Sequence, residues 1–255
     1  MAKKITLQIK GQIALIQINR PEVLNALNRE IIDDLDEMIE QIKEDKSIEV
    51  LIIGGTENFA AGADIKQMVE CNPAQAAKFL FSYTYNKVED LRIPTIAAID
   101  GYALGGGLEL ALTCDLRIAT KEAKMGLPET GIGIMPGAGG TVRLPRTVGM
   151  SKAKEMVFLG ALISGEEAER IGLVNKVVEK DELMPTAMKW AEKLTQRAPI
   201  AISVAKSMLE DGMKTEIKSG VDLEAERWSN LFYTYDQKEG MRAFNEKRKP
   251  VYKGE

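Results

Sequence analysis

Hydrophobic and polar residues alternate along the beginning of the chain with the spacing of β-strands. The alternation covers residues 4–10 and 12–18, and Lys10-Gly11 separates the two runs. A period of two places successive side chains on opposite faces of a strand. The pattern therefore predicts two strands joined by a tight turn, the second of which ends at Asn19-Arg-Pro21.

The next periodic segment has the spacing of a helix. Residues 29–44 follow Asn28, whose side chain is suited to capping a helix N-terminus. One face of this helix carries an apolar stripe, which is typical of a helix that packs on a core. The residues of the stripe are Ile31, Leu35, Met38, Ile39 and Ile42.

Short apolar runs and helical patterns alternate through the rest of the chain, which predicts an α/β protein. The runs of strand length are 49–53, 95–99, 115–119 and 173–178. The helical patterns are 73–91, about 105–114, a segment beginning at about 141, and then 151–159, 165–171, 181–197, 198–211, 216–232 and 236–246.

The strand at 95–99 leads into the stretch with the most distinctive chemistry, Gly101-Tyr-Ala-Leu-Gly-Gly-Gly-Leu-Glu109. Glycines at a helix start let the backbone approach a ligand, and their amides have no acceptor inside the helix. Glu109 follows Gly106 by one turn on nearly the same face. The junction predicts an oxyanion donor beside a carboxylate. The alternative for this stretch alone is tight helix–strand packing with a surface glutamate.

Two further loops are rich in small residues. In Asn58-Phe-Ala-Ala-Gly-Ala-Asp-Ile-Lys66 the backbone around Gly62 is open to a ligand, and Lys66 is a candidate partner for a phosphate. The second loop, within residues 125–140, contains Glu129. Taken alone, the first loop also fits a plain strand-to-helix turn, and Glu129 also fits a solvent-exposed side chain.

Composition narrows the range of functions. The chain has 255 residues, of which 45% are hydrophobic, so it can form one large domain. Its net charge of -4 and its pI of about 5.3 argue against nucleic acid as the main partner. No apolar stretch approaches the ~20 residues that span a bilayer, and the amino terminus does not resemble a signal peptide. With two widely separated cysteines, Cys71 and Cys114, these features predict a cytoplasmic protein with free thiols.

The sequence contains no histidine. This excludes Ser-His-Asp and Cys-His mechanisms and histidine-bearing zinc sites, and we predict no metal site. Glu109 and Glu129 are separated by one predicted strand, and since successive strands are usually neighbours, we expect both to face one pocket. Burial and mutual repulsion would raise at least one of the two pKa values, which gives an acid and a base. The amides of Ala63 and Gly106 are candidate donors to a developing enolate oxygen.

Five segments together resemble the signature segments of the crotonase, or enoyl-CoA hydratase, family. They are Asn19-Arg-Pro21 with Asn25-Ala-Leu27, Phe59-Ala-Ala-Gly-Ala-Asp-Ile-Lys66, Gly101-Tyr-Ala-Leu-Gly-Gly-Gly-Leu-Glu109, Pro128-Glu129 with Pro136-Gly-Ala-Gly-Gly140, and the ending Phe244, Lys247-Arg248, Pro250 and Tyr252. The similarity covers essentially the whole chain. One departure is Glu22, where some hydratases carry a lysine.

The resemblance implies the ClpP/crotonase fold. Residues 1–195 are then expected to form a superhelix of repeated ββα units. Residues 196–255 are expected to form a C-terminal helical region that acts in trimerisation and in completing the active site. The implied assembly is a homotrimer, or a hexamer made of two trimers.

The resemblance also implies a coenzyme A thioester as substrate, with no separate cofactor. The amides of Ala63 and Gly106 are expected to hold the thioester oxygen, Glu109 to orient and activate water, and Glu129 to supply a proton to the α-carbon. The residues implied to bind substrate and coenzyme A are Ala61, Ala63, Asp64, Ile65, Lys66 and Gly106.

Three functions are compatible with these residues and with the resemblance. The leading hypothesis is a lyase that hydrates a trans-2-enoyl-CoA to the 3-hydroxyacyl-CoA, in fatty-acid β-oxidation or in short-chain acyl catabolism. A family isomerase, which needs one base but not two, is the second. The third is a non-catalytic relative that binds acyl-CoA or RNA. The presence of both Glu109 and Glu129 favours the hydratase, and the acidic pI disfavours the RNA-binding relative.

Overall fold

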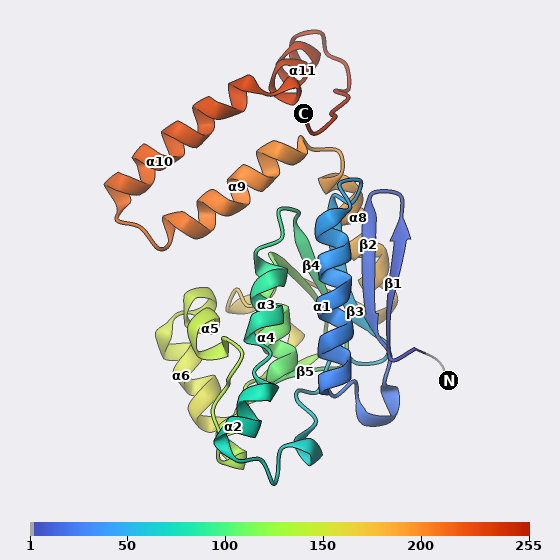
Figure 1. The fold of residues 1–255 in the computed structure, drawn as a ribbon, viewed down its shortest axis with the longest axis vertical. Coiled ribbons are helices and arrows are strands. Elements are labelled where there is room, and N and C mark those ends of the chain that lie inside the picture. Colours follow the sequence, from blue (N-terminus) through green and yellow to red (C-terminus); the bar gives the residue numbers. More distant parts are fainter. Residues whose placement is uncertain (1–2) are drawn as a thin grey trace.

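A six-stranded sheet runs from the core of the molecule to its edge in the structure, which we describe from a computed structural model covering residues 3–255 (Figure 1). The strand order is β1-β2-β3-β4-β6-β9, with β1 and β2 antiparallel and the remaining pairs parallel. These strands are β1 (Ile5–Lys10), β2 (Ile13–Ile18), β3 (Val50–Gly55), β4 (Thr95–Ile99), β6 (Leu116–Thr120) and β9 (Lys176–Val178).

The inner strands β2, β3 and β4 are buried on both faces, which explains why their sequences are almost continuously apolar. On β3, Leu51 and Ile53 pack in one core cluster with the predicted stripe of helix α1 (Arg29–Glu44). The alternate residues Val50 and Ile52 pack in a second cluster with helix α8 (Leu183–Leu194) on the other face. The side chain of Asn28 caps α1 by accepting from the Ile31 amide at 3.0 Å, as the sequence predicted.

A second sheet of three short strands runs beside the first, in the order β5-β7-β8. Its strands are β5 (Tyr102–Leu104), β7 (Lys124–Gly126) and β8 (Ile163–Ser164). Strand β4 is followed by β5 and then helix α4, and β6 is followed by β7 and then helix α5. The chain thus repeats a strand of the large sheet, a strand of the small sheet and a helix, which is the expected ββα superhelix. The short strands themselves were not predicted, because two or three residues show no periodicity.

The remaining core helices lie around the sheets (Figure 1). They are α2 (Pro73–Ala76), α3 (Ser82–Glu89), α4 (Gly106–Thr113), α5 (Gly140–Val148), α6 (Met150–Leu159) and α7 (Gly165–Arg170). The helical region predicted over 73–91 is divided into α2, a short 3-10 helix (Ala77–Phe79) and α3. Leu80 has an extended conformation, with φ −74° and ψ 102°, and this interrupts the hydrogen-bond ladder between α2 and α3.

The last three helices form an arm that extends from the core (Figure 1). They are α9 (Pro199–Gly212), α10 (Ile217–Asn230) and α11 (Tyr235–Asn245). Lys206 of α9 attaches the arm to the core, because its Nζ lies 3.0 Å from Asp115 Oδ2 and donates to the Ile93 carbonyl at 3.2 Å. No helix in the described part of the chain is long and apolar enough to cross a membrane.

Candidate active site

Glu109 is positioned by a tight junction between β5 and α4. Gly105 begins this junction with φ +50° and ψ −124°, a conformation that favours glycine. A Cβ at Gly105 would lie 2.8 Å from Oε1 of Glu129, so the residue must also be small. Every residue of α4 is buried, and Glu109, in its first turn, is only 3% exposed. The junction therefore directs a carboxylate into the protein interior beside Glu129.

The carboxylate of Glu109 is held by a second glycine-rich turn. The amides of Ala138 and Gly140 both donate to its Oε1, each at 2.7 Å. Gly139 between them has φ +109°, which turns the backbone so that both amides face the same oxygen. Burial raises the pKa of Glu109, and these two amides together with the charge of Arg143 offset only part of that effect.

Glu129 has a different environment. It begins the short 3-10 helix Glu129–Ile132 that follows β7 and Pro128, and it is half-buried. Its Oε2 is buried and has no hydrogen-bond partner within residues 3–255. Burial raises the pKa of Glu129 to about 7, and the negative charge of Glu109 adds to this effect. A carboxyl group in this state exchanges a proton readily near neutral pH.

Both glutamates line one cavity of about 380 Å³, as expected for residues on neighbouring ββα units. Most of its wall is apolar and comes from the loops after β3 and β5, from the segments around α2 and α3, and from the 129–138 loop. The lining residues are Ala61, Gly62, Ala63, Ile65, Met68, Ala76, Phe79, Leu80, Phe81, Leu104, Gly105, Gly106, Glu109, Pro128, Glu129, Ile132, Ile134, Met135, Gly137 and Ala138. A mostly apolar cavity with two convergent carboxyl groups has the character of an active site.

Two backbone amides are free at the same cavity. Ala63 bridges to Leu27, but the hydrogen bonds of this bridge use the Gly62 carbonyl and the Asp64 amide, so the Ala63 amide points away from Leu27. The amide of Gly106 is at the first position of α4. Neither amide has an acceptor among the described residues. A Cβ at Gly106 would lie 3.8 Å from the Ala63 nitrogen, so the two donors are close together.

Tyr85 of α3 supports the same junction. Its hydroxyl donates to the Gly106 carbonyl at 2.7 Å, and the side chain is fully buried. Burial, reinforced by the charge of Glu109, raises the pKa of this hydroxyl well above its ordinary value. Tyr85 therefore stays a neutral donor that holds the first peptide unit of α4. Sequence reasoning missed this role, and it also missed the role of the Ala138 and Gly140 amides.

The predicted coenzyme A residues are only partly brought together. Ala61 and Ile65 line the cavity with Ala63 and Gly106. Asp64 instead faces Arg20, with 3.5 Å between its Oδ2 and Nη2 of the arginine. Lys66 is exposed and does not line the cavity. Residues 3–255 contain no group of three or more histidine, cysteine or acidic side chains that could hold a metal ion.

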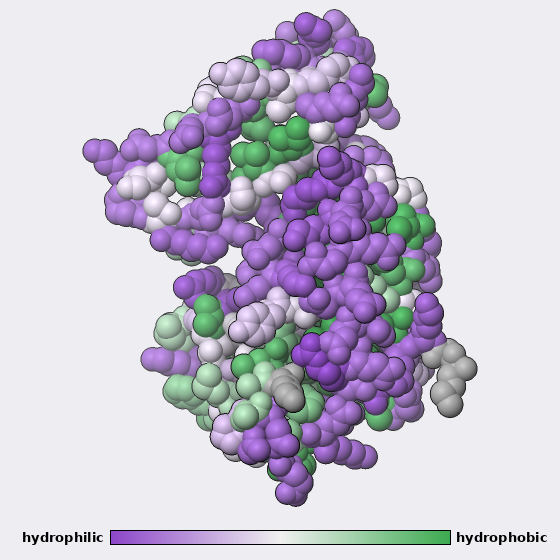
Figure 2. Space-filling model, in the orientation of Figure 1, coloured by the Kyte–Doolittle hydropathy of each residue, from purple (hydrophilic) through white to green (hydrophobic). Residues whose placement is uncertain are grey.

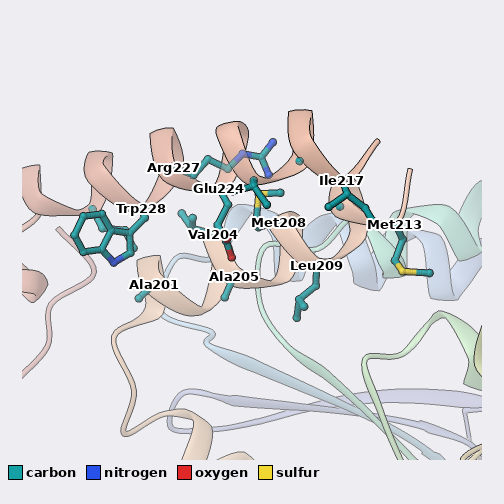
Figure 3. A pocket seen from close by; sticks show the side chains of 14 residues that line it. Ala201, Val204, Ala205, Met208, Leu209, Met213, Ile217, Glu224, Arg227 and Trp228 are labelled. Atoms are coloured by element: carbon teal, nitrogen blue, oxygen red, sulfur yellow. The ribbon is translucent and has the colours of Figure 1, made fainter. Parts of the chain in front are cut away.

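A second hollow of about 520 Å³ lies between α9 and α10 (Figure 3). Apolar side chains from both helices line it, including Met208, Ile217 and Trp228, and hydrophobic residues gather along the same helices in the surface view (Figure 2). Its ionisable lining residues are Glu224 and Arg227, and it holds no pair of carboxyl groups. This groove has the character of a contact surface, whereas the smaller cavity has that of a site for chemistry.

The repeated ββα units, with two glutamates and two free amides at one cavity, are those of a protein with the crotonase fold. Residues 8–255 match the sequence profile of the family described as enoyl-CoA hydratase/isomerase. The chain is 45% identical over 249 residues to a short-chain-enoyl-CoA hydratase of Clostridium acetobutylicum, covering 96% of this chain and 95% of the relative. It is 42% identical over 251 residues to a crotonyl-CoA hydratase of Syntrophomonas wolfei, covering 97% and 96%.

A solved structure gives the same result. The crystal structure of an enoyl-CoA hydratase from Bacillus anthracis superposes with a TM-score of 0.96 at 40% identity, covering 99% of this chain and 100% of that one. The chain therefore belongs to the enoyl-CoA hydratase/isomerase family.

Proposed function

We propose that the protein is a hydro-lyase that adds water across the double bond of a trans-2-enoyl-CoA to give the 3-hydroxyacyl-CoA. The observation that carries this proposal is that Glu109 and Glu129, both with raised pKa values, line one cavity with the free amides of Ala63 and Gly106. The names of the Clostridium and Syntrophomonas relatives support the same reaction.

In this proposal the two amides hold the thioester oxygen. When water adds to C3, negative charge develops on that oxygen as the thioester becomes an enolate. Donors already aimed at that position need no rearrangement, and loss of one such donor typically costs about 3 kcal/mol of transition-state stabilisation. The Gly106 amide is also at the N-terminus of α4, where the helix dipole favours negative charge.

The two glutamates divide the proton transfers between them. Glu109, ionised and fixed through Oε1 by the Ala138 and Gly140 amides, draws a proton from the attacking water, whose oxygen bonds to C3. Glu129, protonated near neutral pH, delivers a proton to C2 as the enolate collapses. The cycle ends with Glu109 protonated and Glu129 ionised, and exchange with solvent restores the starting state.

The substrate is proposed to be bound as its coenzyme A thioester, with no cofactor besides the coenzyme A that belongs to it. The acyl group would occupy the apolar part of the cavity, and the backbone of Ala61 and Ile65 would contact the coenzyme A portion near the thioester. Asp64 and Lys66 remain proposed contacts, toward the outer part of coenzyme A. Lys66 is exposed and well suited to meet a phosphate.

Residues 196–255 are proposed to act in assembly and in completing the active site. The arm exposes apolar side chains that a single copy leaves in water, among them Leu209, Met213 and Ile217 with exposures of 75%, 71% and 83%. A homotrimer, or a hexamer of two trimers, would cover them. Light scattering during size-exclusion chromatography tests this assembly, because a monomer at micromolar concentration would contradict it. A cytoplasmic location and a role in β-oxidation stay predictions.

The decisive experiment is incubation with crotonyl-CoA while the enoyl absorbance is followed. A hydratase removes this absorbance and yields 3-hydroxybutyryl-CoA. An isomerase without hydratase activity would leave crotonyl-CoA unhydrated but move the double bond of a 3-enoyl-CoA. Tight binding of crotonyl-CoA with no conversion of either substrate would indicate the non-catalytic relative and overturn the proposal.

A further inference from the structure

Arg143 of α5 lies behind the turn that holds Glu109. Its Nη1 donates to the Ala138 carbonyl at 3.0 Å, while the Ala138 amide donates to Glu109. The guanidinium also packs directly against Gly139, where a Cβ would fall 1.9 Å from Nη1. Arg143 does not line the cavity, so it acts on Glu109 from behind, through the 138–140 turn and through its nearby positive charge.

The other edge of the guanidinium is anchored on α3. Glu89 accepts two hydrogen bonds, from Nε to Oε1 at 3.1 Å and from Nη2 to Oε2 at 2.6 Å. Asn86 accepts a further one from Nη2 at 2.8 Å. Such a two-point arginine–carboxylate contact fixes the orientation of the guanidinium as well as its place. The Arg143 side chain is 14% exposed, so solvent competes little for these bonds.

One helix thus anchors both halves of the site. Through Tyr85, α3 holds the Gly106 peptide, and through Glu89 and Arg143 it holds the turn that contacts Glu109. The turn needs such an anchor, because the glycines on either side of Ala138 leave the backbone many conformations. The two amides that contact Glu109 keep their positions only while the turn is held in a single conformation.

We propose that Arg143, held by Glu89, is a positioning residue that sets the 138–140 turn so that its amides orient the Glu109 carboxylate toward water. The inference rests on the proposed function, since it concerns how Glu109 activates water. The alternative is that Arg143 only ties α5 to α3, in which case its loss would lower stability and leave the chemistry of each folded molecule unchanged.

The test compares Arg143→Met, Arg143→Lys and Glu89→Gln with the control Arg146→Met. Arg146 is on the same helix, but its guanidinium donates to the Val142 carbonyl of its own helix and not to the 138–140 turn. We expect Arg143→Met to lower kcat for crotonyl-CoA about 10- to 100-fold with little change in KM, since a displacement of about 1 Å at a reacting group costs on the order of 10²-fold. Arg143→Lys and Glu89→Gln should also lower kcat, because each removes the two-point contact, and Arg146→Met should not.

A pH titration separates positioning from simple stabilisation. Arg143→Met should raise the pH at which Glu109 ionises, because the ionised form loses a nearby charge and its fixed amides. Arg143→Lys should restore that pH in part while kcat stays low. The readouts are the acid limb of the rate profile and a carbon-13 NMR titration of labelled glutamate, with melting curves to confirm folding.

Failure of the positioning role of Arg143 can be distinguished from failure of the proposed hydratase function. If the folded Arg143 and Glu89 variants keep the wild-type kcat, the positioning role is wrong, even where the lost charge of Arg143 shifts the Glu109 titration. If the wild-type protein does not hydrate crotonyl-CoA, the proposed function fails. The NMR titration then still decides whether Arg143 controls Glu109. Should Arg143→Met not fold, Arg143→Lys and Glu89→Gln provide the same test.

Discussion

Glu109 and Glu129 line the same cavity, but their carboxyl groups are held in opposite ways. Two backbone amides donate to Oε1 of Glu109, whereas Oε2 of Glu129 is buried without a hydrogen-bond partner in the described part of the chain. Hydrogen bonds to a carboxylate favour its charged form, and burial without them favours the neutral form. The difference supports Glu109 as the base and Glu129 as the acid of one reaction.

Replacement of Glu129 by Gln should abolish most turnover while leaving substrate binding intact. The amide keeps the shape of the side chain, but its N–H protons are far too weakly acidic to be delivered to carbon, and general acids contribute about 10²–10⁴-fold. Steady-state kinetics with crotonyl-CoA and a binding titration measure the two effects. Glu122→Gln is the matched control, since Glu122 is exposed in the turn before β7. Wild-type turnover in Glu129→Gln would remove Glu129 from the mechanism.

The rate should fall on both sides of a pH optimum. Glu129 must be protonated to act as the acid, so kcat/KM should decline as pH rises through about 7, the pKa of this carboxyl group. Glu109 must be ionised to act as the base, so the rate should also decline toward acid pH, at a pH above that of an ordinary glutamate because its pKa is raised. A profile flat from pH 6 to pH 9 would contradict the assigned roles.

Glu129 should also make the folded protein less stable at higher pH. Its folded pKa of about 7 is above the unfolded value of 4.5, so between these values the unfolded state releases its proton more readily. The contribution of Glu129 to stability is therefore lost as pH rises from about 4.5 to about 7. Glu129→Gln should be more stable than the wild type at pH 8 and equal to it near pH 4 by chemical denaturation. The absence of any difference at pH 8 would mean that the carboxyl group is not desolvated in the folded state.

Replacement of Gly106 by Ala should block the site without disturbing the fold. Gly106 has no positive φ, and a Cβ there would meet Phe81 and Tyr85 at 3.7 Å, which is ordinary contact. The methyl group would stand beside the Ala63 amide, where the thioester oxygen binds in the proposed mechanism. A displacement of about 1 Å at a reacting group costs on the order of 10²-fold in rate.

Gly172→Ala is the matched control for that variant. Gly172 has φ +76° with open space around it, so alanine should cost about 1 kcal/mol of stability through the backbone and leave the rate unchanged. Melting curves and crotonyl-CoA hydration are measured for both proteins. Full activity of Gly106→Ala would show that the thioester does not approach this residue.

Chelators should leave the rate unchanged. The sequence lacks histidine, and the proposed mechanism assigns every proton transfer and the oxyanion contact to the chain itself. The measurement is crotonyl-CoA hydration before and after prolonged treatment with EDTA and dialysis. Loss of activity that zinc or magnesium restores would contradict a reaction without cofactors.

The sequence by itself determined the periodic elements and the local chemistry. Alternating apolar residues predicted the first strands, and the apolar stripe predicted α1, because an element that buries one face repeats its apolar residues with its own period. Glu109 was found from its place beside Gly106, since both belong to one helical turn. The resemblance of the motifs to a known family correctly predicted the fold class.

Only the tertiary structure decided how distant segments meet. The Ala138 and Gly140 amides contact Glu109, Arg143 contacts Glu89, and Asp64 faces Arg20 instead of the cavity. The spacing of these residues along the sequence does not indicate that they meet, because their contacts depend on the path of the chain through several ββα units. The strict need for glycine also lies at Gly105, which has a positive φ and whose Cβ would meet Glu129, and not at Gly106. The spacing of residues along the chain indicates which face of a helix or strand a side chain lies on. Only packing in three dimensions decides which residue of another element it contacts.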